Sequence, residues 1–220
     1  MLRVFLYIAG SAAILSTSAF AATINLSTGL DGGGTLQTTS GATDANWVME
    51  GSGGIVSPGT HAQVVNSNSP DWYGGWAADG PNSSWIAANA SVGNQGNLPY
   101  SYQVSFNLTA AEALTASLSS GSWGVDDDGY LQLNGTTISG PDHFNTNPGG
   151  INSFAGTNTG FVSGVNTLTI VTDGTDNDLE AARYEGSVSF TNSSTPEPAS
   201  VFLMLSGLGA GLLTLRRRRQ

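Results

Sequence analysis

Short segments of alternating apolar and polar residues, separated by turn-forming residues, constrain the fold of this chain more than any other feature. The alternation is clear in 101–108. It is also present in 166–172, apart from the adjacent Ile170 and Val171, and in 184–190, where Gly186 weakens it. A period of two places successive side chains on opposite faces of an extended chain, so these segments predict β-strands with one buried face. Five shorter segments have the same character: 23–26, 46–50, 63–65, 85–88 and 130–133.

Turn signals lie between these segments. Asn134-Gly135, which joins 130–133 to 136–138, predicts a hairpin, because a type I′ turn requires positive φ at both central residues. A single helical turn is expected over 109–114, where Thr109 and Glu112 form a capping box. Many short strands with one short helix predict an all-β fold, an antiparallel two-sheet β-sandwich that is jelly-roll-like.

Charge is distributed unevenly along the chain. There is no Lys, and between residues 22 and 195 fifteen carboxylates face one guanidinium, that of Arg183, giving a net charge of -14. Such a field repels phosphate backbones, so no nucleic-acid partner is expected. The chain has no Cys, which excludes disulfides and thiol chemistry.

The N-terminus predicts a secretory signal peptide. Arg3 precedes an apolar run over 4–15, and the small residues Ala19 and Ala21 form an A-x-A cleavage pattern. A buried N-terminal helix would not explain the small residues at the end of the run. We therefore expect the secretion machinery to remove 1–21.

The C-terminus predicts a membrane span. Residues 199–215 are seventeen uncharged residues, about 25 Å as a helix against a hydrocarbon core of about 30 Å. The cluster that follows keeps the tail cytoplasmic and the domain outside, and it consists of Arg216, Arg217, Arg218 and Arg219. Before the span, Pro196-Glu197-Pro198 cannot continue a helix and leaves an extended segment that suits a protease. A permanent anchor is the alternative.

These three C-terminal elements, in this order, resemble the PEP-CTERM sorting signal of Gram-negative bacteria. The resemblance covers 196–220. It implies transient anchoring in the inner membrane, cleavage near Pro-Glu-Pro by an exosortase-type membrane peptidase, and delivery to the cell surface or the exopolysaccharide matrix. Residues 22–195 are then the surface domain.

The central domain carries a second resemblance. Trp85-Ile86, the strand 102–108, the segment 126–135 and the segment 164–170 follow one another as in jelly-roll domains similar to galactose-binding-like modules of bacterial surface proteins. The resemblance spans most of 45–191 and implies the sandwich fold. The chain lacks the sugar-binding set of the lectin members.

Two acidic segments are candidates for a structural calcium ion, which prefers six to eight oxygen ligands. Asp126 and Asp128 lie just before a predicted strand and can point the same way. The second segment contains Asp173, Asp176, Asp178 and Glu180. The alternative for both segments is a solvated acidic turn whose side chains accept hydrogen bonds from local amides.

Aromatic residues concentrate between residues 72 and 85. Trp72, Tyr73 and Trp76 fall in a glycine-rich loop, where exposed rings could stack on sugars. The alternative is that the rings cover an open end of the sandwich. Trp85 leads a predicted strand and is expected in the core.

Nothing in the sequence marks a catalytic set. His61 and His143 are expected in separate loops, with no nucleophile elbow or HExxH motif nearby. We therefore predict that the chain is not an enzyme but a non-catalytic surface or matrix protein. The alternative is a carbohydrate-binding module that docks to exopolysaccharide.

Overall fold

The computed structural model describes residues 19–52, 56–68, 72, 74–90, 99–143, 149–173 and 180–193. Contacts divide the chain into one compact unit, Ala21–Asn192, and a second made of Met1–Phe20 with Ser193–Gln220. The fold below is that of the first unit. Residues 1–18 of the predicted signal peptide 1–21, and the whole sorting tail 196–220, lie outside the described residues. The last three residues of the predicted signal peptide, which include Ala19 and Ala21 of the cleavage pattern, begin β1.

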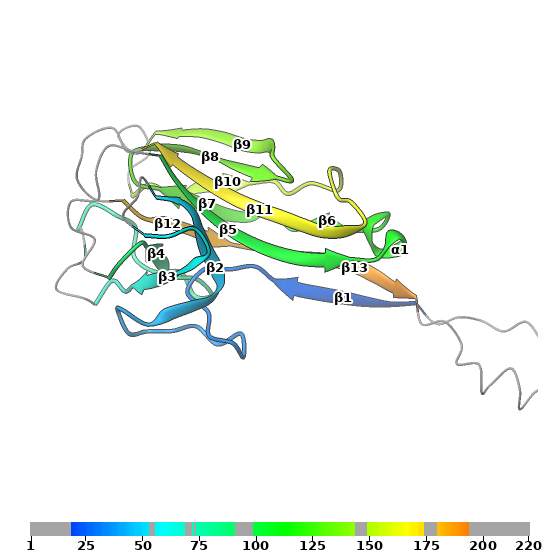
Figure 1. The fold of residues 1–220 in the computed structure, drawn as a ribbon, viewed down its shortest axis with the longest axis horizontal. Coiled ribbons are helices and arrows are strands. Elements are labelled where there is room, and N and C mark those ends of the chain that lie inside the picture. The colour runs from blue at the N-terminus through cyan, green and yellow to red at the C-terminus, as the bar shows by residue number, and fades with distance from the viewer. Residues whose placement is uncertain are drawn as a thin grey trace, which may run out of the picture. The chain divides into compact units, whose positions relative to one another are not determined.

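Strands dominate the described part of the chain (Figure 1). The elements are β1 Ala19–Asn25, β2 Thr43–Ser52, β3 Thr60–Val65, β4 Trp85–Ala87, β5 Pro99–Leu108, α1 Ala110–Ala113, β6 Ser117–Leu118, β7 Gly121–Val125, β8 Asp128–Leu133, β9 Thr136–His143, β10 Asn152–Phe154, β11 Gly164–Asp173, β12 Ala182–Glu185 and β13 Ser187–Ser193. No helix in these described ranges has the length and apolar character that a membrane crossing requires.

The strands form two sheets of unequal size. The large sheet has the order β10-β7-β12-β4-β3-β2-β5-β11-β8-β9, and the small one has the order β1-β13-β6. Neighbouring strands of the large sheet are antiparallel wherever their register is described. The predicted all-β antiparallel class is therefore confirmed.

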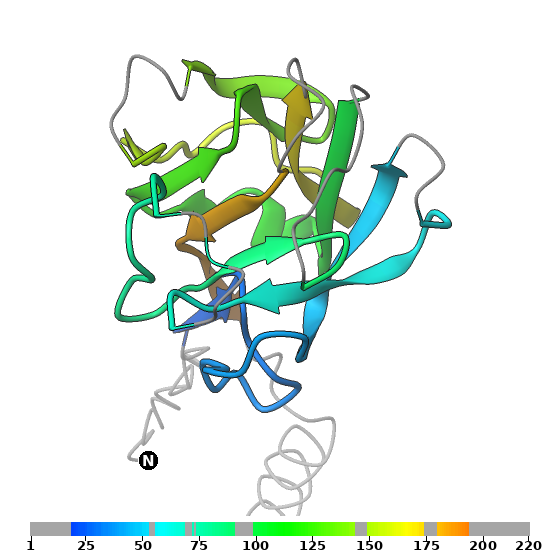
Figure 2. The same cartoon turned by 90° about the vertical axis from the view of Figure 1, so that its left-hand side faces the viewer.

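The large sheet curls until its two ends approach each other, as Figure 2 shows. The Trp123 indole N–H on β7, next to one edge, donates a 2.9 Å hydrogen bond to Ser139 Oγ on β9, at the other edge. The register shifts where β2 pairs with β3 and β5, and again where β8 pairs with β9, with the extra residues on β2 and on β9. Extra residues of this kind bend and twist a strand. A nearly closed ten-stranded sheet with a small companion thus replaces the predicted sandwich of two facing sheets, and the jelly-roll identity stays a prediction.

The core lies inside this curl. Along β5, inward residues alternate with outward ones, so that Tyr102, Val104 and Phe106 are buried while Ser105 and Asn107 are exposed. They pack with fully buried rings from other strands, among them Trp47 and Trp123. The alternation in the sequence is thus the alternation between core and solvent.

The structure confirms two local predictions and corrects a third. Asn134 (φ 50°) and Gly135 (φ 77°) have the positive values of the predicted turn, and both halves of the Thr109–Glu112 capping box are present. The third concerns the segment 184–190, predicted as one strand. It is divided at Gly186 between β12 of the large sheet and β13 of the small sheet, because the chain passes there from one sheet to the other.

Candidate functional site

The two acidic segments of the sequence come together at one end of the large sheet. Asp128 at the start of β8 lies directly opposite Asp173 at the end of β11. Thr172, beside Asp173, donates a 2.7 Å hydrogen bond to Glu180 Oε2. The Asp126 amide in turn donates to the Ala181 carbonyl at 3.0 Å. Asp176 and Asp178 lie outside the described residues.

Several polar groups at this acidic end are buried. Asp126 and Glu180 are 7% and 1% exposed, and Asp142 on β9, which the sequence analysis did not single out, is 1% exposed. Burial, and then the nearby Glu180 carboxylate, raise the pKa of Tyr100 to about 12. Burial, Glu180, Tyr100 and Asp126 raise the pKa of Tyr102 well above its ordinary value. Both phenols therefore stay neutral at physiological pH.

The calcium hypothesis gains no ligand set from the described residues. They contain no group of three or more His, Asp or Glu side chains that could hold a metal ion. Local turn bonding, the alternative, is present: Asp126 Oδ1 accepts from the Asp127 amide at 3.0 Å. Calcium binding by either acidic segment stays a prediction.

The aromatic loop packs into a small core of its own. The Trp76 ring stacks on Trp85 with centroids 5.1 Å apart and lies edge-on to Trp72 at 5.2 Å. Trp85 is fully buried, and its indole N–H donates to the Ala77 carbonyl at 2.8 Å. Trp76 is 4% exposed and Trp72 is half-buried, so of these rings Trp72 presents more of its surface to a ligand. Tyr73 lies outside the described residues.

A polar groove of about 530 Å³ lies where the chain passes from β12 to β13. It was not found in the sequence, because its lining comes from four separate segments and from residue types that are common everywhere in the chain. Two glycines contribute to it, Gly121 and Gly186. The polar lining includes hydroxyls, amides and one carboxylate, from Thr23, Asn25, Asn82, Ser122, Glu185 and Ser187.

Glu185 is the one charged side chain of this groove, and neighbouring groups hold it in place. Asn82 Nδ2 donates to Oε1 at 3.0 Å, and Ser83 Oγ donates to Oε2 at 2.9 Å. Arg183 Nη2 lies 3.4 Å from Oε2. Burial alone would raise the pKa of the Glu185 carboxyl, but these two hydrogen bonds and the Arg183 charge outweigh it and lower the pKa. The groove therefore presents a fixed, ionised acceptor.

Arg183, the one guanidinium between residues 22 and 195, fixes the loop that leads into the groove. Its Nε donates to Ser83 Oγ and its Nη1 to the Ala78 carbonyl, both at 2.8 Å. Burial lowers the pKa of Arg183, while Glu185 and Asp79 oppose that shift. The cation thus ties the loop over 78–83 to β12 and faces a carboxylate of the groove.

Other ionisable groups are engaged in building loops. The Asp44 carboxylate accepts from the amides of Gly29, Asn46 and Trp47. Burial outweighs these bonds and raises the pKa of Asp44. Both histidines, expected in loops, belong to strands: His61 to β3 and His143 to the end of β9. His61 Nδ1 lies 2.7 Å from the Asp44 carbonyl oxygen, and the side chain of His143 is outside the described part.

The all-β fold, the acidic end and the polar groove identify the class of this domain, but they do not identify one activity. The chain's C-terminus is more informative, because residues 194–219 match the PEP-CTERM protein-sorting motif. The protein therefore carries a PEP-CTERM sorting tail, which confirms the resemblance seen in the sequence. The tail implies an exported protein that an exosortase sorts to the cell surface.

The remaining comparisons concern the whole chain. No curated protein matches it. Among solved structures, it is similar to the crystal structure of a Stig cyclase, Fisc from Fischerella sp. TAU, in complex with (3Z)-3-(1-methyl-2-pyrrolidinylidene)-3H-indole. The identity is 11%, the match covers 78% of this chain and 100% of that chain, and the TM-score is 0.39.

Proposed function

We propose that this protein is a non-catalytic component of the cell surface or the exopolysaccharide matrix, held in the inner membrane until exosortase processing releases it. One observation supports the non-catalytic part of the proposal: Asp44, Arg183 and Glu185 make hydrogen bonds or an ion pair within the domain. Asp44 accepts from three backbone amides, and Arg183 fixes a loop and faces Glu185. A general acid or base has to reach a substrate and exchange a proton with it, and groups held in this way are poorly placed to do so.

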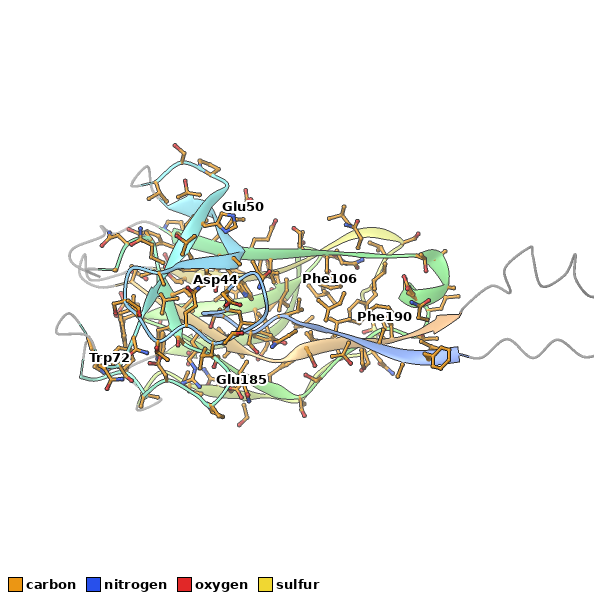
Figure 3. The ribbon with its side chains drawn as sticks, turned by 90° about the horizontal axis from the view of Figure 1, so that it is seen from below. Asp44, Glu50, Trp72, Phe106, Glu185 and Phe190 are labelled. Carbon is orange, nitrogen blue, oxygen red and sulfur yellow. The ribbon has the colours of Figure 1, made fainter. Side chains whose placement is uncertain are left out.

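The second candidate is carbohydrate binding, and the polar groove favours it. Its volume lies within the range of about 300–1,000 Å³ found for small-molecule sites. The Glu185 carboxylate can accept hydrogen bonds from sugar hydroxyls, and the hydroxyl and amide side chains around it can both donate and accept. Trp72, the half-buried ring, does not line this groove, and it offers a separate surface on which a sugar could stack; Figure 3 labels both Trp72 and Glu185.

Mass spectrometry of the protein from its native cells tests the sorting part of the proposal. We expect a mature chain that begins at Ala22 and has lost the cluster 216–219. A mature chain that retains the four Arg residues would show a permanent anchor instead.

A binding assay with the purified domain and the exopolysaccharide of the same cells tests the second candidate. Glu185→Gln keeps the shape of the groove and removes its charge, so we expect at least tenfold weaker binding. The matched control is Glu50→Gln, an identical change at an exposed residue of β2 that does not line the groove. Absence of binding by the parent domain would exclude this candidate, and shortening of the glycan during the assay would contradict the non-catalytic assignment.

A further inference from the structure

The domain has an apolar end. Three large apolar side chains are strongly exposed there: Leu114 at 88%, Val165 at 61% and Val162 at 48%. Leu114 directly follows α1, which continues from β5, while Val162 and Val165 flank the start of β11. The two strands are paired at this end, with Val165 opposite Asn107. Phe20, which is also exposed, precedes the predicted cleavage point and is not counted here.

The chain leaves the domain for its sorting tail at this same end. The Thr191 amide on β13 donates a 3.0 Å hydrogen bond to Thr115 Oγ1, and Thr115 is the neighbour of Leu114. β13 ends at Ser193, and the sorting motif begins at residue 194. Figure 1 shows α1, the start of β11 and the end of β13 on the same side.

The tether between domain and membrane is short. Five residues separate Ser193 from Ala199, the first residue of the predicted span. Fully extended, these six steps reach about 20 Å, because each residue adds at most about 3.3–3.6 Å. While the tail is intact, the end of β13 therefore stays close to the bilayer surface.

A group of carboxylates lies at the other end of β8 and β11. β11 joins the two ends of the domain: the exposed, apolar Val165 lies near its start, and the acidic Asp173 lies at its end, eight residues or about 26 Å further on. Asp173 lies there with Asp128, Asp126 and Glu180, the acidic end described above. Glu112 lies at the apolar end, where its carboxylate accepts from the Thr109 amide at 2.7 Å as part of the helix cap.

We propose that, in the anchored precursor, the apolar end rests on the outward-facing surface of the bilayer, with Leu114, Val162 and Val165 among the headgroups. The short tether holds this end near the membrane, and contact removes its apolar side chains from water. The opposite orientation would bring the acidic end to the headgroups, where anionic lipid repels it. The proposal depends on the C-terminal span and not on glycan binding, so either can fail without the other.

A pair of labelled variants tests this orientation. The chain has no Cys, so a single introduced Cys carries the label alone. Val165→Cys and Asp173→Cys place a fluorophore at the two ends of β11, at exposed positions in both cases. The full chain with its intact tail is reconstituted in vesicles that contain an anionic lipid and a quencher attached to the headgroups. We expect quenching at position 165 to be at least threefold stronger than at 173.

Equal quenching at the two positions, stronger quenching at 173, or failure of the full chain to float with the vesicles would each overturn the proposal. The apolar contact itself is tested in the Val165→Cys chain by adding Leu114→Glu, which should weaken the quenching at least twofold. The matched control is Ser57→Glu, which adds the same charge at an exposed turn between β2 and β3. Leu114→Glu that leaves the quenching as in this control would show that the apolar end does not touch the lipid. Circular dichroism checks that each variant is folded.

Discussion

Replacement of Trp76 by Ala separates the two interpretations of the aromatic loop. Trp76 is 4% exposed, stacks on Trp85 and contacts Trp72 edge-on. Truncation of a buried Trp or Phe to Ala costs about 3–5 kcal/mol, and aromatic pairs contribute about 0.5–1.5 kcal/mol beyond their buried area. We therefore expect a loss of about 4 kcal/mol, a large part of the roughly 5–15 kcal/mol that stabilises a typical domain.

The assay is thermal unfolding of the mature domain, followed by far-UV circular dichroism because the substitution removes a fluorophore. For a domain of this size, about 2–4 °C per kcal/mol predicts a Tm lower by about 8–16 °C. The matched control is Trp72→Ala, which truncates a half-buried ring of the same cluster and should lower the Tm by less than half as much. A Trp76→Ala domain that melts within 2 °C of the parent would refute the assignment of this ring to the core.

Three further predictions concern single features. The fold lowers the pKa of Glu185, so the stability that its carboxylate contributes is present above the ordinary pKa of about 4.3 and is lost as the pH falls through the lower folded value. The Glu185→Gln domain should therefore lose less stability than the parent as the pH falls below about 4.3, measured by urea unfolding at each pH. Gly135→Ala should cost about 1–2 kcal/mol in urea unfolding, since its φ of +77° strains any Cβ, while Gly32→Ala, with open space and no positive φ, should change little. Calcium bound at the acidic segments and supplied at a hundred times its Kd would add about 2.7 kcal/mol to the free energy of unfolding. The Tm should then rise with calcium and return to its starting value with EDTA. A Tm that calcium leaves unchanged would contradict the calcium hypothesis.

The features that the sequence predicted correctly are those decided by near neighbours. The alternation over 101–108 reappears as the buried and exposed faces of β5, because a strand with one face on a core needs that pattern. The Asn134-Gly135 hairpin and the Thr109–Glu112 cap depend on residues no more than three positions apart. Trp85 was placed in the core for the same reason, since it begins an apolar segment.

The missed strand β7 shows why the rest could not be predicted. Its sequence, Gly-Ser-Trp-Gly-Val, contains two glycines, which weaken any strand prediction. The structure supplies the reason for one of them: a Cβ on Gly124 would lie 1.6 Å from the Gly150 carbonyl oxygen. That approach joins segments 26 residues apart, and no local pattern contains it.

The assembly of the candidate sites could not be predicted from the sequence for a related reason. Asp128 and Asp173 are recognisable as acidic residues, but their pairing depends on the register of β8 against β11. The groove around Glu185 needs the passage between two sheets at Gly186, in a segment predicted as one continuous strand. Residue types were therefore readable, whereas their assembly depends on long-range pairing.

The scarcity of cations gives a final prediction about salt. The central domain has a net charge of -14 over 22–195, and the described residues show one ion pair, between Arg183 and Glu185. Its other well-defined carboxylates are held by hydrogen bonds, as Asp79 is by Asn66 Nδ2 and the Ser67 amide. Because carboxylates outnumber guanidinium groups fifteen to one over 22–195, added salt screens more repulsion than attraction, so the Tm should rise as NaCl increases from about 10 mM to 150 mM.

The Arg183→Met variant provides the control for this salt dependence. The substitution removes the ion pair and lowers the Tm, because it leaves the Ala78 carbonyl and Ser83 without their donor. It also raises the net negative charge, so the increase of Tm with salt should persist or steepen. A Tm of the parent domain that falls with added NaCl would show that attractive ion pairs outweigh repulsion. That result would contradict the account of a fold whose carboxylates are stabilised mainly by amides and hydroxyls.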